Sequence, residues 1–265
     1  MKLKSTPLKN QIAIGVDLGL TKSAVASAIT SSGTVIGRKF INQPIEKDRL
    51  KKKLNRLAKA KRKSGLIKAP NYWRKINALQ KAIVQKTADE IVSFAIKHNA
   101  DVIVFEYLGK FKKPKNSYGA RKLRAKLQYW AKRKIQNLTI QKANSYGIRI
   151  RFVSPKGTSK YAFDGSGEVQ RNAKRDIATF SNGKIYHADL NASYNIGARY
   201  FIKELTKPLS ETVRLQAEAK VPLFAKRTSH SLASLIRLRE VLEELPLKTS
   251  LSRIQAKEAP AKPLI

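Results

Sequence analysis

Three acidic residues stand at points of the sequence where carboxylates could do chemistry. Asp17 ends the apolar run QIAIGVD, Glu106 ends the run VIVFE, and Asp189 begins the helical pattern DLNASYNIGARYFIKEL. Each has an ordinary structural interpretation: a strand-end turn residue, a salt-bridge partner for lysine, and a helix N-cap, respectively. Because the chain has only 18 Asp and Glu residues, two acids placed at strand ends favour a functional interpretation of the set.

Carboxylates gathered in one place would need divalent cations to offset their mutual repulsion. Oxygen ligands suit Mg²⁺ or Mn²⁺, which keep several waters and take remaining ligands from a substrate phosphate. Two such ions about 3.5 to 4 Å apart would activate a water and stabilise the leaving oxygen of a phosphodiester. We therefore expect Asp17, Glu106 and Asp189 to be the catalytic metal ligands of a two-ion site that hydrolyses DNA or RNA.

The elements that must position these acids are those of a mixed α/β protein. Adjacent strand ends would bring Asp17 beside Glu106, and the first turn of a packed helix would add Asp189, where the helix dipole helps to keep it ionised. The pattern predicts strands over residues 11–17, 22–30, 34–41, 102–106 and 148–155, and helices over residues 47–63, 76–94, 118–144, 189–205 and 229–245.

Composition indicates a folded protein with a polyanionic partner. The chain has 265 residues, 42% of them hydrophobic, and 55 Lys and Arg residues give a formal charge of +37. Nucleic acid is the natural counter-charge. A membrane surface is the competing polyanion, but no segment approaches the roughly 20 apolar residues of a membrane span, and no signal peptide is evident. We expect an intracellular, cytoplasmic, nucleoid-associated protein without a membrane partner.

Two stretches carry most of the unopposed positive charge. Residues 47–63 hold ten basic residues and one acidic one, and residues 107–163 hold sixteen basic residues and no acid. A solvated helix accounts for part of this charge, but acidic partners at i,i+4 are scarce, which favours phosphate contact. The expected nucleic-acid-binding residues are Lys51, Lys52, Lys53, Arg56, Lys59, Lys61, Arg62 and Lys63, with Arg121, Lys122 and Arg124.

Four aromatic residues with basic neighbours could stack on unpaired bases. They are Tyr72, Trp73, Tyr129 and Trp130. Trp130 lies on an apolar stripe and is interpreted as a core residue, whereas Trp73 stands beside a Pro-Asn break and is the better stacking candidate.

The segments around the three acids resemble a known nuclease family. GVDLGLTKSAVAS, VIVFEYLG and HADLNASYNIG are similar, in order and surroundings, to the RuvC motifs of the transposon-encoded TnpB nucleases and the type V CRISPR effectors. The third is the most specific, and the resemblance covers residues 11 to about 205. It implies a ribonuclease H-like (RuvC) fold, a Mg²⁺-binding triad of Asp17, Glu106 and Asp189, and DNA cleavage directed by a guide RNA.

The family's zinc ribbon has no cysteines here. Proteins of this kind usually carry two CxxCG knuckles between the second and third motifs, and YAFDG and TFSNG stand in their places. The chain has no Cys, which excludes disulfides and thiolate zinc sites. We expect two metal-free hairpins and no zinc, and interpret His187 as a surface or site-rim residue. The four replaced positions are Tyr161, Asp164, Thr179 and Asn182.

The expected domain organisation follows from the resemblance. Residues 1–205 form a RuvC-like nuclease domain, with a basic helical insertion at 46–99 and the cysteine-free ribbon at 157–188; residues 206–265 form a helix and a disordered tail. Relatives carry a region that binds guide RNA and target before the first motif, whereas about a dozen residues precede it here. The chain is then a fragment, works with a separate polypeptide that supplies this region, or acts without a full guide complex.

Two other functional classes remain open at this point. A catalytically idle nucleic-acid-binding remnant would keep the acids without cutting. GVDLGLTKS also resembles the first phosphate-binding strand of actin-like ATPases and sugar kinases, but that fold needs a duplicated domain and a second Gly-rich phosphate loop, which the sequence does not offer.

Overall fold

The protein is built around a five-stranded mixed sheet in the order β3-β2-β1-β4-β5. The computed structural model describes residues 3–4, 6–19, 22–65, 69–107, 131–221 and 228–244. The first three strands form an antiparallel meander, and β4 and β5 run parallel to β1, which confirms the predicted α/β class with a mixed sheet. The strands are β1 Ile12–Asp17, β2 Ala24–Thr30, β3 Val35–Ile41, β4 Val102–Glu106 and β5 Arg149–Val153.

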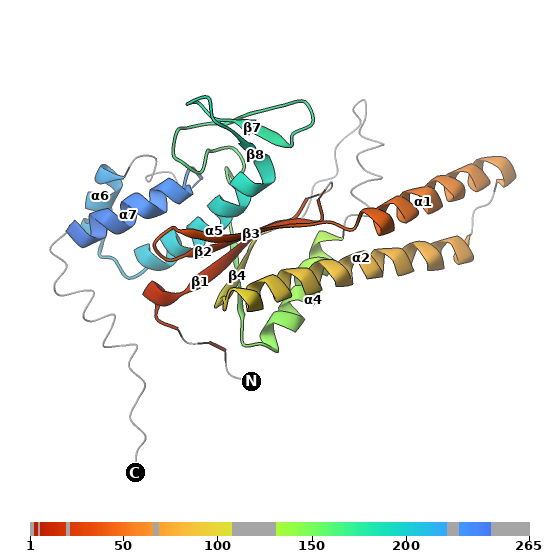
Figure 1. Ribbon diagram of the computed structural model, residues 1–265, viewed down its shortest axis with the longest axis horizontal. Coiled ribbons are helices and arrows are strands. Elements are labelled where there is room, and N and C mark those ends of the chain that lie inside the picture. Colours follow the sequence, from red (N-terminus) through yellow and green to blue (C-terminus); the bar gives the residue numbers. More distant parts are fainter. Residues whose placement is uncertain are drawn as a thin grey trace, which may run out of the picture.

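Helices cover both faces of this sheet and extend beyond it at each side (Figure 1). A long hairpin, α1 and α2, projects from one side, while α6 and α7 lie at the other (Figure 1). A second, three-stranded sheet in the order β6-β7-β8 lies next to the start of α5. The remaining elements are η1 Leu8–Asn10, α1 Pro44–Ser64, α2 Pro70–Lys97, α4 Lys132–Asn144, β6 Gln170–Arg171, β7 Ile177–Thr179, β8 Ile185–His187, α5 Ala188–Thr206, α6 Glu211–Lys220 and α7 Leu232–Glu244.

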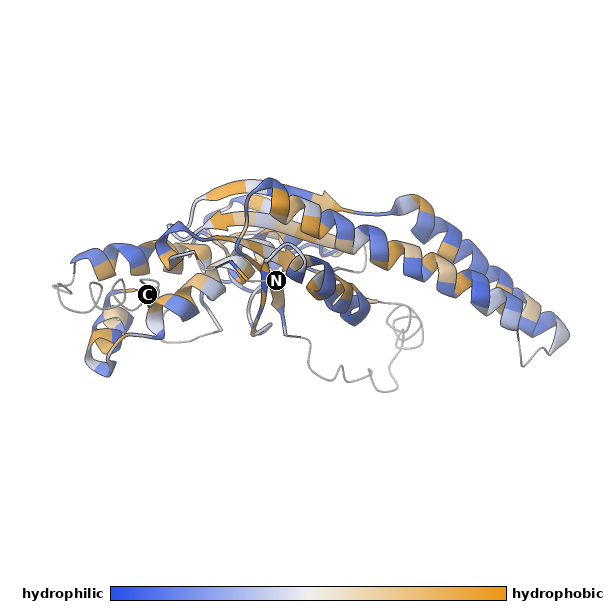
Figure 2. Ribbon diagram, turned by 90° about the horizontal axis from the view of Figure 1, so that it is seen from below, coloured by the Kyte–Doolittle hydropathy of each residue, from blue (hydrophilic) through white to orange (hydrophobic). Residues whose placement is uncertain are grey.

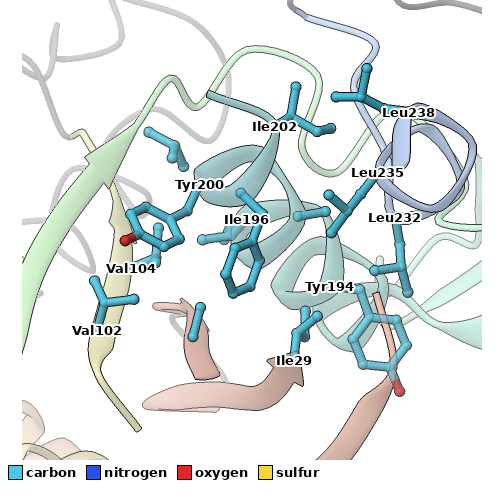
Figure 3. Packing of buried hydrophobic residues seen from close by; sticks show 14 of the residues in the cluster. Ile29, Val102, Val104, Tyr194, Ile196, Tyr200, Ile202, Leu232, Leu235 and Leu238 are labelled. Atoms are coloured by element: carbon cyan, nitrogen blue, oxygen red, sulfur yellow. The ribbon is translucent and has the colours of Figure 1, made fainter. Parts of the chain in front are cut away.

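Strand alternation divides the core into two layers. On one face, Val102, Val104 and their neighbours pack against α5, and α7 covers α5 from outside (Figure 3). On the other face, Ile103 and Phe105 pack against α2 and α4. Because successive side chains of a strand point to opposite faces, the near-continuous apolar runs of β1 and β4 are explained by burial on both sides.

Helix α5 lies unusually close to the central strand. A Cβ atom at Gly15 would lie 2.2 Å from the carbonyl oxygen of Ser193 and 2.7 Å from the amide nitrogen of Gly197. Two glycines facing each other therefore let the α5 backbone approach β1 directly. This contact fixes where the first turn of α5 lies relative to the end of β1.

The α1–α2 hairpin has a narrow core of its own. Leu57, Ala69 and Ile76 are buried there, and Trp73 packs partly against them. The rest of its outer part is mostly hydrophilic, as Figure 2 shows for the segment that extends past the sheet. A two-helix hairpin with so little apolar surface is a projecting arm, not a second domain core.

Tight turns stand at both places where the family carries knuckles. Gly165 and Gly183 adopt left-handed φ angles of 81° and 82°. Asp164 Oδ1 accepts hydrogen bonds from the backbone nitrogen and hydroxyl of Ser166. Asn182 Nδ2 donates to Asp164 Oδ2 at 3.1 Å, so a hydrogen bond joins two of the four positions expected to correspond to the family's cysteines.

The structure adds a helix that the sequence did not predict, and part of another predicted helix lies outside the described residues. Helix α6 was not predicted, and α4 is described from Lys132 onward, so residues 118–130 of the predicted helix lie outside the described residues. The tail from Pro246 also lies outside them. Within the described residues, no helix is long and apolar enough to cross a membrane.

Candidate active site

Asp17 and Glu106 end neighbouring parallel strands. The register pairs Val16 with Phe105, and each acid is the next residue of its strand. Counting back in steps of two, Asp17 shares a face with Gly15, and Glu106 shares a face with Val104; both belong to the face covered by α5. The two acids therefore lie side by side at the carboxyl edge of the sheet, below the start of α5.

Asp189 reaches the same edge from the first turn of α5. The residue that caps this helix is His187, and Asp189 is the second helical residue, so the N-cap interpretation of Asp189 is wrong. A Cβ at Gly19, two residues after Asp17, would lie 3.9 Å from Asp189 Oδ2. Asp189 thus points toward the loop that follows β1, which places all three acids at one edge.

The carboxylates interact strongly enough to change the protonation of one of them. The pKa of Asp17 is raised from 3.8 to about 7, chiefly by burial and then by the negative charges of Glu106 and Asp189, while Lys132 and Arg171 oppose the shift. A carboxyl group that is half protonated near neutral pH is the expected result of burial combined with neighbouring like charges. Perturbed groups of this kind concentrate at functional sites.

Glu106 is held in place by two further polar groups. Thr158 donates its hydroxyl to Glu106 Oε1 at 2.6 Å, and Gln136 Nε2 donates to the backbone oxygen of Glu106 at 3.1 Å. Thr158 Oγ1 also lies 3.0 Å from the carbonyl oxygen of Pro155. Thr158 therefore orients the Glu106 carboxylate through Oε1, and Gln136 holds the Glu106 backbone. Neither residue donates to Oε2.

A polar stripe on α5 holds the loop that carries Thr158. Asn195 Nδ2 donates to the carbonyl oxygens of Thr158 and Tyr161, and its Oδ1 accepts from the backbone nitrogen of Leu232. Asn191 Nδ2 donates to the same Tyr161 oxygen. The two asparagines are fully buried, so they act as a clamp between α5, this loop and α7.

Arg199 completes this stripe four residues further along α5. Its guanidinium donates to the carbonyl oxygens of Ser154, Lys156, Thr228 and His230 at 2.6 to 3.1 Å. Burial lowers its pKa to about 10, and the charge of Glu106 opposes this shift. The sequence analysis assigned no role to Asn191, Asn195 or Arg199, although their i,i+4,i+8 spacing on an otherwise apolar helix is a visible signal.

The donor types at this edge fit a hard divalent cation. All three side chains are carboxylates, the ligands that Mg²⁺ and Mn²⁺ prefer. As the side chains are placed, no three His, Cys, Asp or Glu residues in the described part of the chain form a group that could hold a metal ion. The charges of Glu106 and Asp189 act on Asp17, but the three carboxylates are not placed as a closed set of ligands.

The predicted nucleic-acid-binding residues fall into two groups. In α1, six of them are exposed and Lys53 and Lys61 are half-buried. Lys52 forms an ion pair with Asp48 at 2.9 Å. The second group, Arg121, Lys122 and Arg124, lies outside the described residues, as do Tyr129 and Trp130.

The aromatic and histidine predictions are modified by the structure. Trp73 packs in the hairpin core with Lys61 Nζ 5.8 Å from its ring centroid, so it is less available for base stacking than its exposed neighbour Tyr72. His187 lies against Phe40 with ring centroids 4.8 Å apart, and its Nδ1 is buried without a hydrogen-bond partner. It is partly buried at the rim of the acidic edge.

Known proteins match part of this chain. The family model described as "Cas12f1-like, TNB domain" matches residues 133–196. A TnpB-like protein of Aquifex aeolicus is 29% identical over 130 residues, which are 46% of this chain and 42% of that protein. The CRISPR-associated endodeoxyribonuclease Cas12f1 of an uncultured archaeon is 34% identical over 86 residues, which are 32% of this chain and 16% of that protein.

A solved structure agrees with these sequence matches. The cryo-EM structure of a Cas12f1-sgRNA-target DNA complex superposes with a TM-score of 0.52 at 23% identity, over 70% of this chain and 49% of that one. The mixed sheet, its strand order and α5 across its face define a ribonuclease H-like fold. The resemblance to the TnpB-like proteins and the type V CRISPR effectors, stated above from three sequence motifs, is confirmed. The chain spans less than half the length of either relative.

Proposed function

We propose that this chain is a divalent-metal-dependent nuclease that hydrolyses phosphodiester bonds of DNA, guided by RNA. The observation that carries the proposal is the meeting of Asp17, Glu106 and Asp189 at one sheet edge, with a raised pKa at Asp17. The similarity to a TnpB-like protein and to a CRISPR-associated endodeoxyribonuclease supports the same reaction class. The RNA partner is proposed from that similarity and from the net charge of +37.

In this proposal the three carboxylates hold two Mg²⁺ or Mn²⁺ ions, which supply Lewis-acid chemistry when bound. The protein contributes the positions of the ligands. Thr158 fixes Glu106, and the contact of α5 with Gly15 fixes Asp189 relative to Asp17. Oriented ligands reduce the reorganisation needed when the substrate phosphate arrives.

The exposed basic residues of α1 are proposed to bind the sugar-phosphate backbone. Such contacts contribute affinity without base specificity, and each phosphate contact adds about 0.9 to the magnitude of the log-log salt slope on duplex DNA. Replacement of Lys51 and Lys59 by Gln should lower the slope by between about one and two. Lys203 and Lys207, two exposed lysines at the end of α5, provide the matched control pair for the same change.

The test of the reaction is a cleavage assay on labelled DNA with Mg²⁺, with and without added RNA. We expect Asp17→Ala, Glu106→Gln and Asp189→Ala each to abolish cleavage while leaving most DNA affinity, because lysines and arginines supply the phosphate contacts. Glu240→Gln, an exposed residue of α7 paired with Arg237, is the control for the Glu106 change.

Full activity in any one of the three variants removes that residue from the site. Binding without cleavage by the wild-type protein, unchanged in Asp17→Ala, would instead favour an idle nucleic-acid-binding protein. If cleavage requires a separate polypeptide, that partner supplies the function of the part of the relatives that this chain does not match.

A further inference from the structure

Lys132 reaches the acidic edge from the opposite side of the sheet. It is the first residue of α4, and α4 packs through Ile135 and Ala143 on the face opposite to α5. Gln136, one turn further along, donates to the backbone oxygen of Glu106 at 3.1 Å. Because residues four apart lie on the same side of a helix, Lys132 is directed to the end of β4, where the acids lie.

The electrostatics agree with this placement. Lys132 interacts with Asp17, Glu106 and Asp189, and each of the three carboxylates favours its charged form. Burial acts in the opposite direction and lowers the pKa of Lys132 overall. In return, the charge of Lys132 lowers the pKa of Asp17. Lys132 is therefore a partly buried cation that faces all the acids of the site.

We infer that Lys132 is a substrate-binding residue of the proposed nuclease site, which offsets part of the charge of the carboxylates before metal binds and holds a non-bridging oxygen of the substrate phosphate afterwards. This inference rests on the proposed function. An ammonium group is a compact charge with three donors and suits a phosphate oxygen. Gln136 and Thr158 are neutral and already engaged with Glu106. Arg171 also lowers the pKa of Asp17, but it is exposed and its guanidinium donates to the carbonyl oxygen of Ser159.

Removal of the Lys132 charge should have opposite effects on metal binding and on substrate cleavage. A positive charge close to the ligands repels a divalent cation, so its removal should strengthen metal binding by about tenfold or more. The same removal takes a charged donor from the substrate phosphate, so cleavage should slow by about a hundredfold. A residue that only packs α4 against the sheet would weaken both or affect neither.

The experiment compares Mn²⁺ binding and DNA cleavage in the full chain. Mn²⁺ titrations followed by electron paramagnetic resonance need no substrate and report on the site alone. The variants are Lys132→Met, which keeps the apolar stem, and Lys132→Arg, which keeps the charge. Lys134→Met removes an exposed lysine from the same turn and is the matched control. Lys132→Gln repeats the metal measurement should the methionine variant not fold.

The expected result is tighter Mn²⁺ binding and slower single-turnover cleavage in Lys132→Met, with wild-type metal affinity in Lys132→Arg and Lys134→Met. Unchanged or weaker Mn²⁺ binding in Lys132→Met and Lys132→Gln overturns the inference while the proposed nuclease remains. Failure of the wild-type protein to bind Mn²⁺ overturns the proposed function, and the role of Lys132 falls with it.

Discussion

Replacement of Asp17 by Asn should stabilise the metal-free protein at pH 8. The carboxyl group has a pKa of about 7 in the folded chain, against 3.8 for the ordinary group, because burial and the charges of Glu106 and Asp189 disfavour its ionised form. At about 1.4 kcal/mol per pKa unit, ionising it at pH 8 costs the folded state about 4 kcal/mol. Asp17 is partly exposed to water, and screening by water reduces this destabilisation of the folded state to about 2 kcal/mol.

The pH dependence has a definite sign. Between about pH 4 and pH 7 the folded state binds more protons at Asp17 than the unfolded state does, so stability falls as pH rises through this window. The advantage of Asp17→Asn should therefore be largest at pH 8 and nearly absent at pH 4. Urea unfolding in EDTA, followed by circular dichroism at both pH values, measures it.

The control for this measurement is Asp48→Asn, an exposed surface change that should have a small effect. Added Mg²⁺ should stabilise the wild-type protein at pH 8 and remove the advantage of Asp17→Asn, because metal offsets the same repulsion. Equal stability of Asp17→Asn and wild type in EDTA at pH 8, or a difference of the same size at pH 4, would refute the reasoning.

The remaining predictions concern the support of the site. Gly15→Ala should cost about 3 kcal/mol, because its Cβ meets the α5 backbone. Gly65→Ala, whose Cβ meets nothing within 4 Å, should lose only the roughly 1 kcal/mol that its left-handed φ of 59° costs an alanine; urea unfolding compares the two, and equal losses contradict the close contact. Asn195→Ala should also cost about 3 kcal/mol, because it leaves buried carbonyl groups without donors, and a thermal melt unchanged from wild type would exclude the clamp. A zinc chelator should leave the melting temperature unchanged, and one zinc per chain in the purified protein would contradict the metal-free ribbon.

The sequence predicted the strand ends of the site because strands have a simple signal. Apolar runs that end in a single acid identified Asp17 and Glu106, and the order of the strands agrees with the predicted mixed sheet. Their shared face could not be predicted, because it depends on the register between β1 and β4. That register is set by contacts between residues about 90 positions apart along the chain.

The supporting residues were harder to predict for the same reason. Lys132 lies in a long run of basic residues and nothing local distinguishes it from Lys134; its role depends on where α4 meets β4. Thr158 lies in a polar loop, and its contact with Glu106 spans 52 residues. In contrast, Asn191 and Asn195 are four residues apart, a spacing that predicts one side of a helix. The sequence analysis interpreted them as part of a family motif and not as a buried polar stripe.

Helix α6 was missed because its signal is short. It has ten residues with one buried side chain, Ala217. Its start was nonetheless marked in the sequence, since Ser210 caps the helix by accepting from the backbone nitrogen of Val213 and Glu211 follows in the first turn. Helix α6 was missed because its apolar face is weak, although its first residues follow the usual capping pattern.

The hydrogen bond between Asp164 and Asn182 determines which chemical conditions weaken the ribbon, residues 157–188. Thiolate knuckles are vulnerable to oxidants and to shortage of metal, whereas an amide paired with a carboxylate has no redox chemistry. Burial tends to raise the pKa of Asp164, but hydrogen bonds from Ser166 and Asn182 outweigh it and hold that pKa below its usual value. The contribution of this pair is then complete at neutral pH and is lost as the pH falls through the pKa of Asp164, so acid is the condition expected to loosen this part of the protein.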